Sequence, residues 1–496
     1  MKNQITRTNI AISAMLLLAS LMSACSNHAD TSDAVTTQPA DTETNVQESL
    51  TPEEEFLRTV PAADQFGADD FIIGWAQQYD VNEAAYTLEE AEGDAINEAI
   101  YQRNLMTEEK LGIKISAQNI GSWLDIPSAV AKLVQADADE YDVLCMSTVQ
   151  TFNCVLQGYM HELSALDNMD FTHPWWDTEA ILEMYSHGTD DVYFVSGDIN
   201  YQDDFALGAV MFNKKLCADR DIEPYQDVRD GTWTFDTYHR YLAEFGSDVD
   251  GDGKYTVDDM YGTMTGSGVL SYFLASAGEH LIQFDQDGNA YLNSSERIFN
   301  VADKVLRVTS DKNSAQYCIM DANARIGWEL GGTMFPNGHS AFAEDSIRKV
   351  TELRFSMEAD FGILPFPKYD EAQQSYYSPL STAAATAYSI PVSNDDPETD
   401  AWVLEVMGCY STDTVRYAAM ETALTGKLIR DKESEEMLDL IFDTKFYDLG
   451  FWGSNVYGSI CAMVHSYSNK FVSTVESMQK QTAKQYEAVK DYYSFD

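Results

Sequence analysis

Cysteine and positive charge are both scarce in this sequence. The 496 residues include 7 cysteines, and none of them forms a CxxC pair. A disulfide framework or a structural zinc site needs characteristic cysteine spacings, so this pattern argues against both, although one disulfide stays open. Lysine and arginine number 31 against 81 aspartates and glutamates, which gives a formal net charge of −50 at pH 7. A chain this acidic repels nucleic acid and anionic membrane surfaces.

Common catalytic motifs are missing as well. The chain has no GxSxG, HExxH, Walker A or GxGxxG segment, and its 8 histidines include no i, i+4 pair typical of metal ligands. The two carboxylates of a glycoside hydrolase have no fixed spacing in sequence, so that class stays open. We expect a protein that is not an enzyme and has no catalytic residues.

The first 25 residues have the pattern of an export signal. Lys2 and Arg7 give a positive start, and residues 10–22 are apolar over a stretch shorter than the ~20 residues that a spanning helix needs. Two small residues then precede Cys25, and this ending resembles the lipobox of bacterial lipoproteins, in which the cysteine carries the lipid. The alternative is an ordinary cleaved signal with a chance cysteine. We expect a signal peptide over 1–24, lipidation of Cys25, and a mature chain anchored on the extracellular face of the cell membrane.

The stretch after the signal predicts a tether and then an α/β body. Residues 25–65 are rich in small and polar side chains, which is typical of a flexible linker. Strand-length apolar runs follow at 71–75, 113–115 and 141–146, with helical patterns between them. Such alternation favours a mostly parallel sheet covered by helices.

Two helices and one further strand are predicted with some precision. The helical pattern that begins near residue 95 ends at Leu111, where Gly112 is a natural C-cap. Residues 208–213 form another apolar run, typical of a buried strand. At the C-terminus, apolar side chains recur every three or four residues over 475–489, which predicts one helix packed on the core.

Four short segments occur in order along the rest of the chain: residues 211–216 (MFNKKL), 338–342 (GHSAF), 363–367 (ILPFP) and 388–391 (YSIP). Together they resemble the extracellular solute-binding proteins of bacterial ABC importers, the group that contains the maltose-type sugar binders. The resemblance implies the α/β, two-lobed periplasmic-binding-protein type II fold, with a hinge between the lobes and helices at the C-terminus. It also implies a monomer that binds a sugar or oligosaccharide and passes it to ABC permease subunits.

Carried onto this chain, the resemblance places lobe one at 66–200 and 386–430 and lobe two at 201–385 and 431–496. The carboxyl ends of both sheets then face the ligand, where loops can supply aromatic faces and hydrogen-bonding groups. The candidate ligand-binding residues, chosen by their position at predicted strand ends, at the crossover or beside the matching segments, are Trp75, Gln77, Ser147, Thr148, Tyr201, Asp204, Trp328, Glu344 and Trp452. For each of them, core packing or plain surface is an equally good reading.

An acidic loop at 248–259 fits the spacing of an EF-hand calcium site. The candidate ligands, at positions 1, 3, 5, 7, 9 and 12 of the loop, are Asp248, Asp250, Asp252, Lys254 (through its carbonyl), Thr256 and Asp259. Three carboxylates within five residues repel one another unless a cation lies among them. We expect a structural Ca²⁺, and the alternative is an acidic surface turn without metal.

The sequence therefore predicts a lipid-anchored binding protein that delivers a solute to an ABC permease and does not bind nucleic acid. The acidic surface disfavours anionic ligands, so a neutral solute is preferred. Two other classes stay open: a secreted carbohydrate-active enzyme, and a sensory or adhesion lipoprotein built on the same fold.

Overall fold

The computed structural model describes residues 50–67, 70–77, 83–88, 90, 93, 95–122, 125–183, 190–311, 315–320, 332–424, 431–451 and 454–492. The predicted signal peptide and Cys25 lie outside the described residues, as do Trp328 and Trp452. No helix in the described part is both long and apolar enough to cross a bilayer.

The predicted tether extends too far toward the body, because folded structure begins near residue 51. Helix α2 (Pro52–Leu57) starts with a capping box, in which Thr51 and Glu54 bond each other's backbone N–H. Its Phe56 is buried and packs on the rings of Trp175 and Trp402, with centroids 5.2 and 6.1 Å away. The pattern Thr-x-x-Glu predicts the start of a helix, but the polar composition of the surrounding residues favoured a linker instead.

The first sheet has strand order β12–β3–β1–β2. Strands β1 (Asp70–Gln77), β2 (Lys114–Ser122) and β3 (Val143–Ser147) run parallel, as the sequence predicted, and β12 (Thr386–Ser389) is added antiparallel to β3. The late strand β12 returns to a sheet whose other members all precede residue 148. Helix α3 (Ala95–Leu111) ends where predicted, and Gly112 has the positive φ of 73° that a C-cap glycine adopts.

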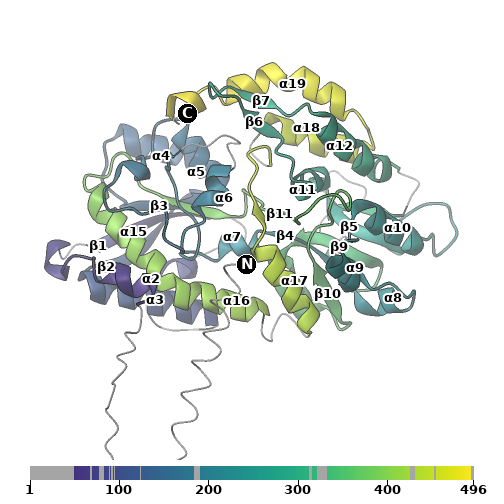
Figure 1. The fold of residues 1–496 in the computed structure, drawn as a ribbon, viewed down its shortest axis with the longest axis horizontal. Helices are drawn as coiled ribbons and strands as arrows, with labels where there is room; N and C mark the ends of the chain where they lie inside the picture. The colour runs from purple at the N-terminus through teal and green to yellow at the C-terminus, as the bar shows by residue number, and fades with distance from the viewer. Residues whose placement is uncertain are drawn as a thin grey trace, which may run out of the picture. The chain divides into compact units, whose positions relative to one another are not determined.

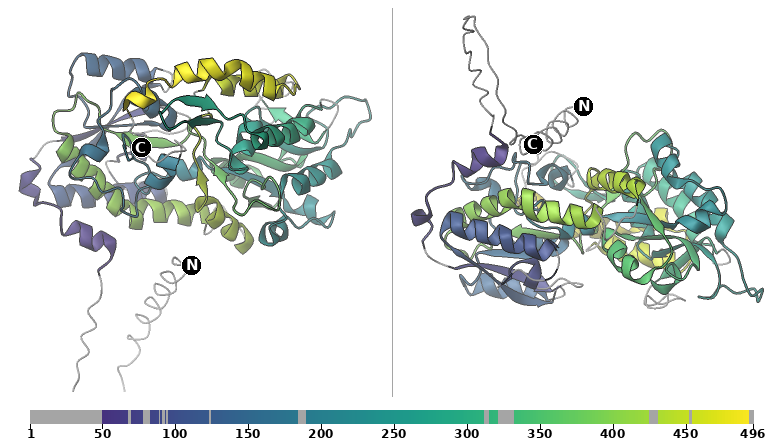
Figure 2. Two further views of the ribbon diagram at one scale, coloured as in Figure 1. Left: turned by 45° about the horizontal axis from the view of Figure 1, so that its top comes forward. Right: turned by 90° about the horizontal axis from the view of Figure 1, so that it is seen from below.

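Helices α3 and α15 (Pro397–Ser411) lie side by side against this sheet (Figures 1 and 2). The other helices of this part are α4 (Ile126–Gln135), α5 (Thr148–Val155), α6 (Thr178–Glu183) and α16 (Tyr417–Leu424).

A buried acid on α15 holds the corner at residues 170–176. The carboxylate of Glu405 accepts hydrogen bonds from the backbone N–H of Asp170 (2.7 Å), from His173 Nδ1 (3.0 Å) and from the indoles of Trp175 (3.0 Å) and Trp176 (3.2 Å).

The second sheet has strand order β10–β4–β9–β5–β8 and mixes both directions. Its strands are β4 (Gly208–Asn213), β5 (Tyr261–Gly266), β8 (Tyr317–Met320), β9 (Ser340–Ser346) and β10 (Phe361–Leu364). Strand β4 has the predicted bounds and is buried throughout. Strand β5 is parallel to both β8 and β9, so the carboxyl ends of these three strands meet at one edge of the sheet.

The helices associated with the second sheet come from two distant parts of the sequence. They are α7 (Gln202–Phe205), α8 (Lys214–Ala218), α9 (Pro224–Asp230), α10 (Phe235–Phe245), α11 (Val269–Ser276), α12 (Glu296–Thr309), α14 (Ile347–Ser356), α17 (Lys432–Phe442), α18 (Asn455–His465), α19 (Phe471–Gln485) and α20 (Val489–Tyr492). The single C-terminal helix predicted over 475–489 is in fact two helices, because α19 ends before Tyr486. Helices α18 and α19 lie beside the hairpin of β6 (Ile282–Phe284) and β7 (Ala290–Leu292) (Figure 1).

Candidate functional site

A cavity of about 660 Å³ opens at the carboxyl ends of β5 and β9. Its wall continues from these strands into the turn before α11, the start of α14, and α18. Ser381, from the crossover that leads to β12, also lines it, so the cavity borders the segment that connects the two sheets. Open α/β sheets bind ligands at this kind of position, where strands end and helices begin.

Glu344 on β9 is the buried acid of this cavity. Its side chain is 5% exposed, and Oε1 accepts a hydrogen bond of 2.8 Å from the Tyr238 hydroxyl. Its other oxygen, Oε2, has no hydrogen bond of ordinary geometry among the described residues, and the Thr265 hydroxyl also acts on this carboxyl group. Burial raises the pKa of Glu344 to about 8. The carboxyl group is therefore largely protonated at neutral pH and can donate a hydrogen bond to a ligand hydroxyl.

Aromatic rings form one wall of the cavity and are held in place by other rings. Tyr272 stacks on Phe366, with centroids 5.3 Å apart and an interplanar angle of 12°, and meets Phe451 edge to face at 4.6 Å. Tyr457 lies close to the backbone at Gly268, where a Cβ atom would be 2.6 Å from its Oη. A Cβ atom at position 268 would therefore force the Tyr457 hydroxyl to shift.

The remaining lining residues are small and polar or carry opposite charges. Hydroxyl groups come from Ser267, Ser346 and Ser381, and a half-buried thiol comes from Cys461. Lys349 pairs with Glu352 at the same cavity. The cavity thus offers donors, acceptors and apolar ring faces together, which is the mixture that a polyhydroxylated ligand requires.

The candidates on the first sheet are packed inside the protein. Trp75 stacks on Tyr86 with centroids 5.6 Å apart and is buried in the core beneath α3 and α15. Ser147 and Thr148 are buried at the start of α5, where the N–H of Thr148 donates to the carbonyl of Ala385 at 3.0 Å. Gln77 ends β1, and its side chain lies outside the described part. The structure does not bring these residues to the cavity of Glu344.

Tyr201 and Asp204 lie on the crossover, away from that cavity. Tyr201 precedes α7 and meets the Phe205 ring edge to face at 5.5 Å. Asp204 belongs to an ion cluster around Lys445, whose Nζ lies 2.8 Å from Asp204, 2.6 Å from Asp177 and 3.0 Å from Asp203. Burial alone would lower the pKa of Lys445, and the carboxylates outweigh it and raise that pKa. Lys445 was not foreseen, because its partners are more than 240 residues away in sequence.

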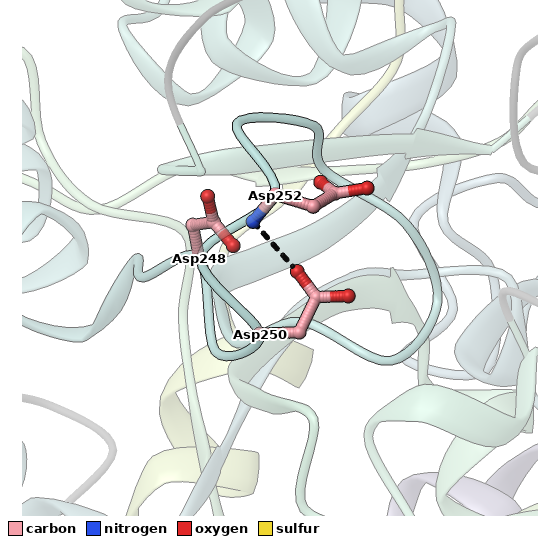
Figure 3. Close-up of side chains that lie close together, drawn as sticks. All are labelled: Asp248, Asp250 and Asp252. Atoms are coloured by element: carbon pink, nitrogen blue, oxygen red, sulfur yellow. Dashed lines mark hydrogen bonds between the residues drawn. The ribbon is translucent and has the colours of Figure 1, made fainter.

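The acidic loop brings together three of its six predicted calcium ligands. One carboxylate oxygen from each of Asp248, Asp250 and Asp252 lies within 4.8 Å of the others (Figure 3). Asp250 accepts a hydrogen bond of 3.0 Å from the N–H of Asp252, and Asp248 accepts from Gly251 (2.7 Å) and Gly253 (2.8 Å). These bonds, first of all the one from Gly253, lower the pKa of Asp248, so its carboxylate stays charged.

The other end of the loop departs from the EF-hand pattern. Asp259 is buried, and its carboxylate accepts from the backbone N–H of Val249 (2.8 Å) and of Thr256 (2.7 Å). The Lys254 amine is 3.9 Å from Asp252. The loop leads from α10 into strand β5 and not into a second helix. The geometry is therefore that of a closed acidic turn with three carboxylates on one side.

Comparison with known proteins identifies the fold. No family model matches the chain, and no curated protein matches its sequence. Among solved structures, the ABC substrate-binding protein Lmo0181 of Listeria monocytogenes, in complex with cycloalternan, is similar over 84% of this chain and 99% of its own, with 12% identity and a TM-score of 0.53. The GacH receptor of Streptomyces glaucescens, solved unliganded and with acarbose, is similar over 86% and 99%, with 12% identity and a TM-score of 0.52. UgpB of Mycobacterium tuberculosis, in complex with glycerophosphocholine, is similar over 85% and 99%, with 12% identity and a TM-score of 0.53.

The chain has the fold of the ABC solute-binding proteins. This confirms the predicted fold class, an α/β two-lobed binding-protein fold, and supports the resemblance seen in the sequence at the level of fold. The lobe boundaries given above stay predictions.

Proposed function

We propose that this chain is a lipid-anchored extracellular solute-binding protein that delivers a neutral sugar or oligosaccharide to the permease of an ABC importer and carries out no reaction itself. The fold supports the general class. It does not select the ligand, because structures of the same fold hold cycloalternan, acarbose or glycerophosphocholine. The choice of a sugar comes from the chemistry of the cavity.

The buried carboxyl of Glu344 is the observation that carries this proposal. A neutral acid with one oxygen that has no hydrogen bond of ordinary geometry among the described residues can donate to a hydroxyl of the ligand without bringing a charge into the cavity. Tyr272 and Tyr457 supply ring faces for the apolar side of a pyranose.

Titration calorimetry of Glu344 variants against a panel of neutral oligosaccharides, with a glycerophosphodiester as comparison, tests the ligand class. Glu344→Gln keeps an N–H donor at the same place, and we expect its affinity to stay near that of the wild type. Glu344→Ala removes the donor and should weaken binding about tenfold, since one buried hydrogen bond contributes about 1–1.5 kcal/mol. Glu436→Gln, in an exposed ion pair with Arg229, is the matched control. Equal affinity of the alanine variant and the wild type would remove Glu344 from the site.

Analysis of the ligand after incubation separates binding from catalysis. We expect the oligosaccharide to be recovered unchanged by chromatography. Release of shorter sugars, lost on changing one carboxylate, would overturn the transport proposal in favour of a secreted carbohydrate-active enzyme.

The lipid anchor is tested at Cys25. Expressed with its signal in a bacterial host, the wild-type chain should fractionate with the membrane, and Cys25→Ser should be released or remain unprocessed. Mass spectrometry of the mature N-terminus reads the modification directly. A wild-type chain that is cleaved and secreted without lipid would contradict the anchor.

We further propose that Asp248, Asp250 and Asp252 bind a structural Ca²⁺. Carboxylate oxygens are the ligands that Ca²⁺ prefers, and three of them converge here. Calorimetry should show one Ca²⁺ site that Asp250→Asn weakens strongly, whereas Asp287→Asn, in the hairpin turn between β6 and β7, should leave it unchanged. Absence of Ca²⁺ binding at millimolar concentration would identify the loop as an acidic turn.

A further inference from the structure

A buried phenol contacts the acid of the cavity from the interior of the protein. Tyr238, on α10, is 0% exposed and lies outside the lining of the cavity. Its hydroxyl donates to Glu344 Oε1 at 2.8 Å, although the two residues are 106 positions apart in the sequence. The hydrogen bond therefore joins a helix of the interior to the strand that carries the acid of the cavity wall.

Three aromatic rings hold the Tyr238 ring in place. Its centroid lies 5.2 Å from that of Trp233, 5.3 Å from that of Phe342 and 6.3 Å from that of Phe273. Phe342 meets it edge to face, and Phe273 is stacked with it. Aromatic pairs of these kinds have preferred geometries, so the phenol has little freedom to turn away from Glu344. Tyr238 is thus a rigid hydrogen-bond donor.

The hydrogen bond from Tyr238 distinguishes the two oxygens of the Glu344 carboxyl group. A neutral carboxyl group has one oxygen that accepts and one that carries the proton. Oε1 accepts from Tyr238, and Oε2 has no hydrogen bond of ordinary geometry among the described residues. The proton therefore belongs on Oε2, and Tyr238 is the residue that decides between the two oxygens.

The neighbours of Glu344 within the sheet and on α10 are uncharged. Val210 on β4 is its register partner, and Thr265 on β5 lies one step beyond the last register pair of β5 with β9. Tyr317 on β8 bonds to His239 Nε2 at 3.1 Å. Burial lowers the pKa of His239 to about 4 and raises that of Tyr317, so both are neutral at physiological pH.

The charged groups near Glu344 lie on α14 and at the end of β9. Asp345 accepts from the next backbone N–H at 2.7 Å, Lys349 pairs with Glu352, and Arg348 lines the same cavity. Two positive and two negative side chains thus accompany the carboxyl group. Besides burial, the groups that act on the pKa of Glu344 are the two hydroxyls described above, on α10 and on β5.

We propose that Tyr238 is a positioning residue for the solute site and that the pair of Tyr238 and Glu344 makes solute binding depend on pH. The neutral carboxyl group donates from Oε2 to an acceptor oxygen of the solute, and ionisation removes that donor. Tyr238 does not touch the solute and acts through Glu344. This inference rests on the proposed function, in which Glu344 contacts a neutral solute.

The pH range of the effect follows from the raised pKa of Glu344, which is about 8. Because only the neutral form donates, the apparent affinity falls with the fraction of the protein that carries the proton. Binding is then nearly complete at pH 6. At pH 9 about one tenth of the protein keeps the proton, so the affinity should be about tenfold lower.

Titration calorimetry at pH 6 and pH 9, with the neutral oligosaccharide of the panel that binds most tightly, tests this dependence. The wild type should lose affinity about tenfold between the two pH values. Glu344→Gln should show no such loss, because an amide does not titrate. Equal affinity of the wild type at both pH values would overturn the proposed regulation.

Tyr238→Phe removes the hydroxyl and keeps the ring. A hydrogen bond to an ionised carboxyl group is stronger than one to a neutral group, so its loss should raise the pKa of Glu344 by about one unit. The affinity should then fall only about twofold between pH 6 and pH 9, and at pH 6 it should be about threefold below the wild type, because the carboxyl group is no longer oriented. Tyr317→Phe, which removes the hydroxyl bonded to His239, is the matched control and should keep the tenfold fall.

Infrared spectroscopy of the protein without solute separates this inference from the choice of solute. The C=O band of a protonated carboxyl group that is present in the wild type and absent from Glu344→Gln should titrate near pH 8, and at higher pH in Tyr238→Phe. An unchanged midpoint in Tyr238→Phe would overturn the positioning role, whichever solute binds. A shifted midpoint in a protein that binds no neutral sugar would support the role of Tyr238 and overturn the proposed function.

Discussion

Two buried glutamates in this protein differ in how many hydrogen bonds they accept. Glu405, on the helix that covers the first sheet, accepts four hydrogen bonds from Asp170, His173, Trp175 and Trp176. Glu344, in the cavity of the second sheet, accepts from Tyr238 and keeps one oxygen without a hydrogen bond of ordinary geometry among the described residues. An acid saturated by the protein fixes structure, whereas an unsaturated acid that lines a cavity is available to a ligand. The number of partners, and not burial, distinguishes an anchor from a binding group here.

Removing the saturated acid should have the largest effect on stability. Glu405→Ala leaves two indole N–H groups and one backbone N–H without their acceptor, and each such loss costs about 1–3 kcal/mol. We expect the free energy of unfolding to fall by about 3–5 kcal/mol in urea titrations, and Glu405→Gln to lose less because it keeps one acceptor oxygen. If the free energy of unfolding falls no further in Glu405→Ala than in Glu344→Ala, the proposed difference between the two acids is wrong.

Replacing the unsaturated acid, Glu344, should instead raise the stability of the protein at alkaline pH. Because the pKa of Glu344 is raised from 4.5 to about 8 by folding, its contribution to stability is full below pH 4.5 and is lost as the pH rises toward 8. Glu344→Gln removes this loss, so we expect the free energy of unfolding of the variant to exceed that of the wild type by about 4 kcal/mol at pH 8 and by about 1 kcal/mol at pH 5. Urea titrations at both pH values measure it, and parallel curves would contradict the raised pKa.

A smaller effect is expected at the wall of the cavity. Gly268→Ala places a Cβ 2.6 Å from the Tyr457 hydroxyl oxygen, so the tyrosine must move. We expect ligand affinity to fall about tenfold with little change in the free energy of unfolding. Gly338→Ala, in a turn with open space around it, controls for the loss of a glycine, although its positive φ makes a small stability cost of its own. Unchanged affinity would exclude this wall from the binding site.

The smallest effect on stability is expected at His173, which is hydrogen-bonded to Glu405. Burial lowers the pKa of His173, and the bond to Glu405 more than compensates, so the pKa is raised. Its contribution is therefore present below the unfolded pKa and disappears as the pH rises through the folded one. We expect His173→Gln to lower stability at pH 5.5 by about 1 kcal/mol or less and to have less effect at pH 8. A larger loss of stability at pH 8 than at pH 5.5 would contradict the raised pKa of His173.

Much of the fold could be predicted from local patterns. The end of α3 at Leu111 followed from Gly112, and the bounds of β4 followed from one apolar run, because both signals lie within a few neighbouring residues. The apolar side chains at the C-terminus keep a helical spacing through Tyr486 and Val489, yet helix α19 ends at Gln485. Periodicity alone does not show where a helix stops.

The site was less predictable, for a geometric reason. A position at the end of a strand places a residue at the sheet edge, but it does not say which face its side chain takes. Trp75 therefore appeared to be a ligand contact, and it stacks on Tyr86 in the core. Glu344 was proposed from its place beside the matching segment 338–342, and it lines the cavity. Lys445 and Tyr238 had no local signal, because their partners come from distant parts of the chain.

The half-buried Cys461 supplies the protein with its own chemical reporter. Of the described cysteines, it is the one that is not fully buried, and it lines the cavity of Glu344. A thiol-specific reagent should therefore modify Cys461 first, at a rate set by access to the cavity. A solute in the cavity would slow that reaction in proportion to its occupancy. Competition against alkylation can then rank candidate solutes without a label or an engineered site.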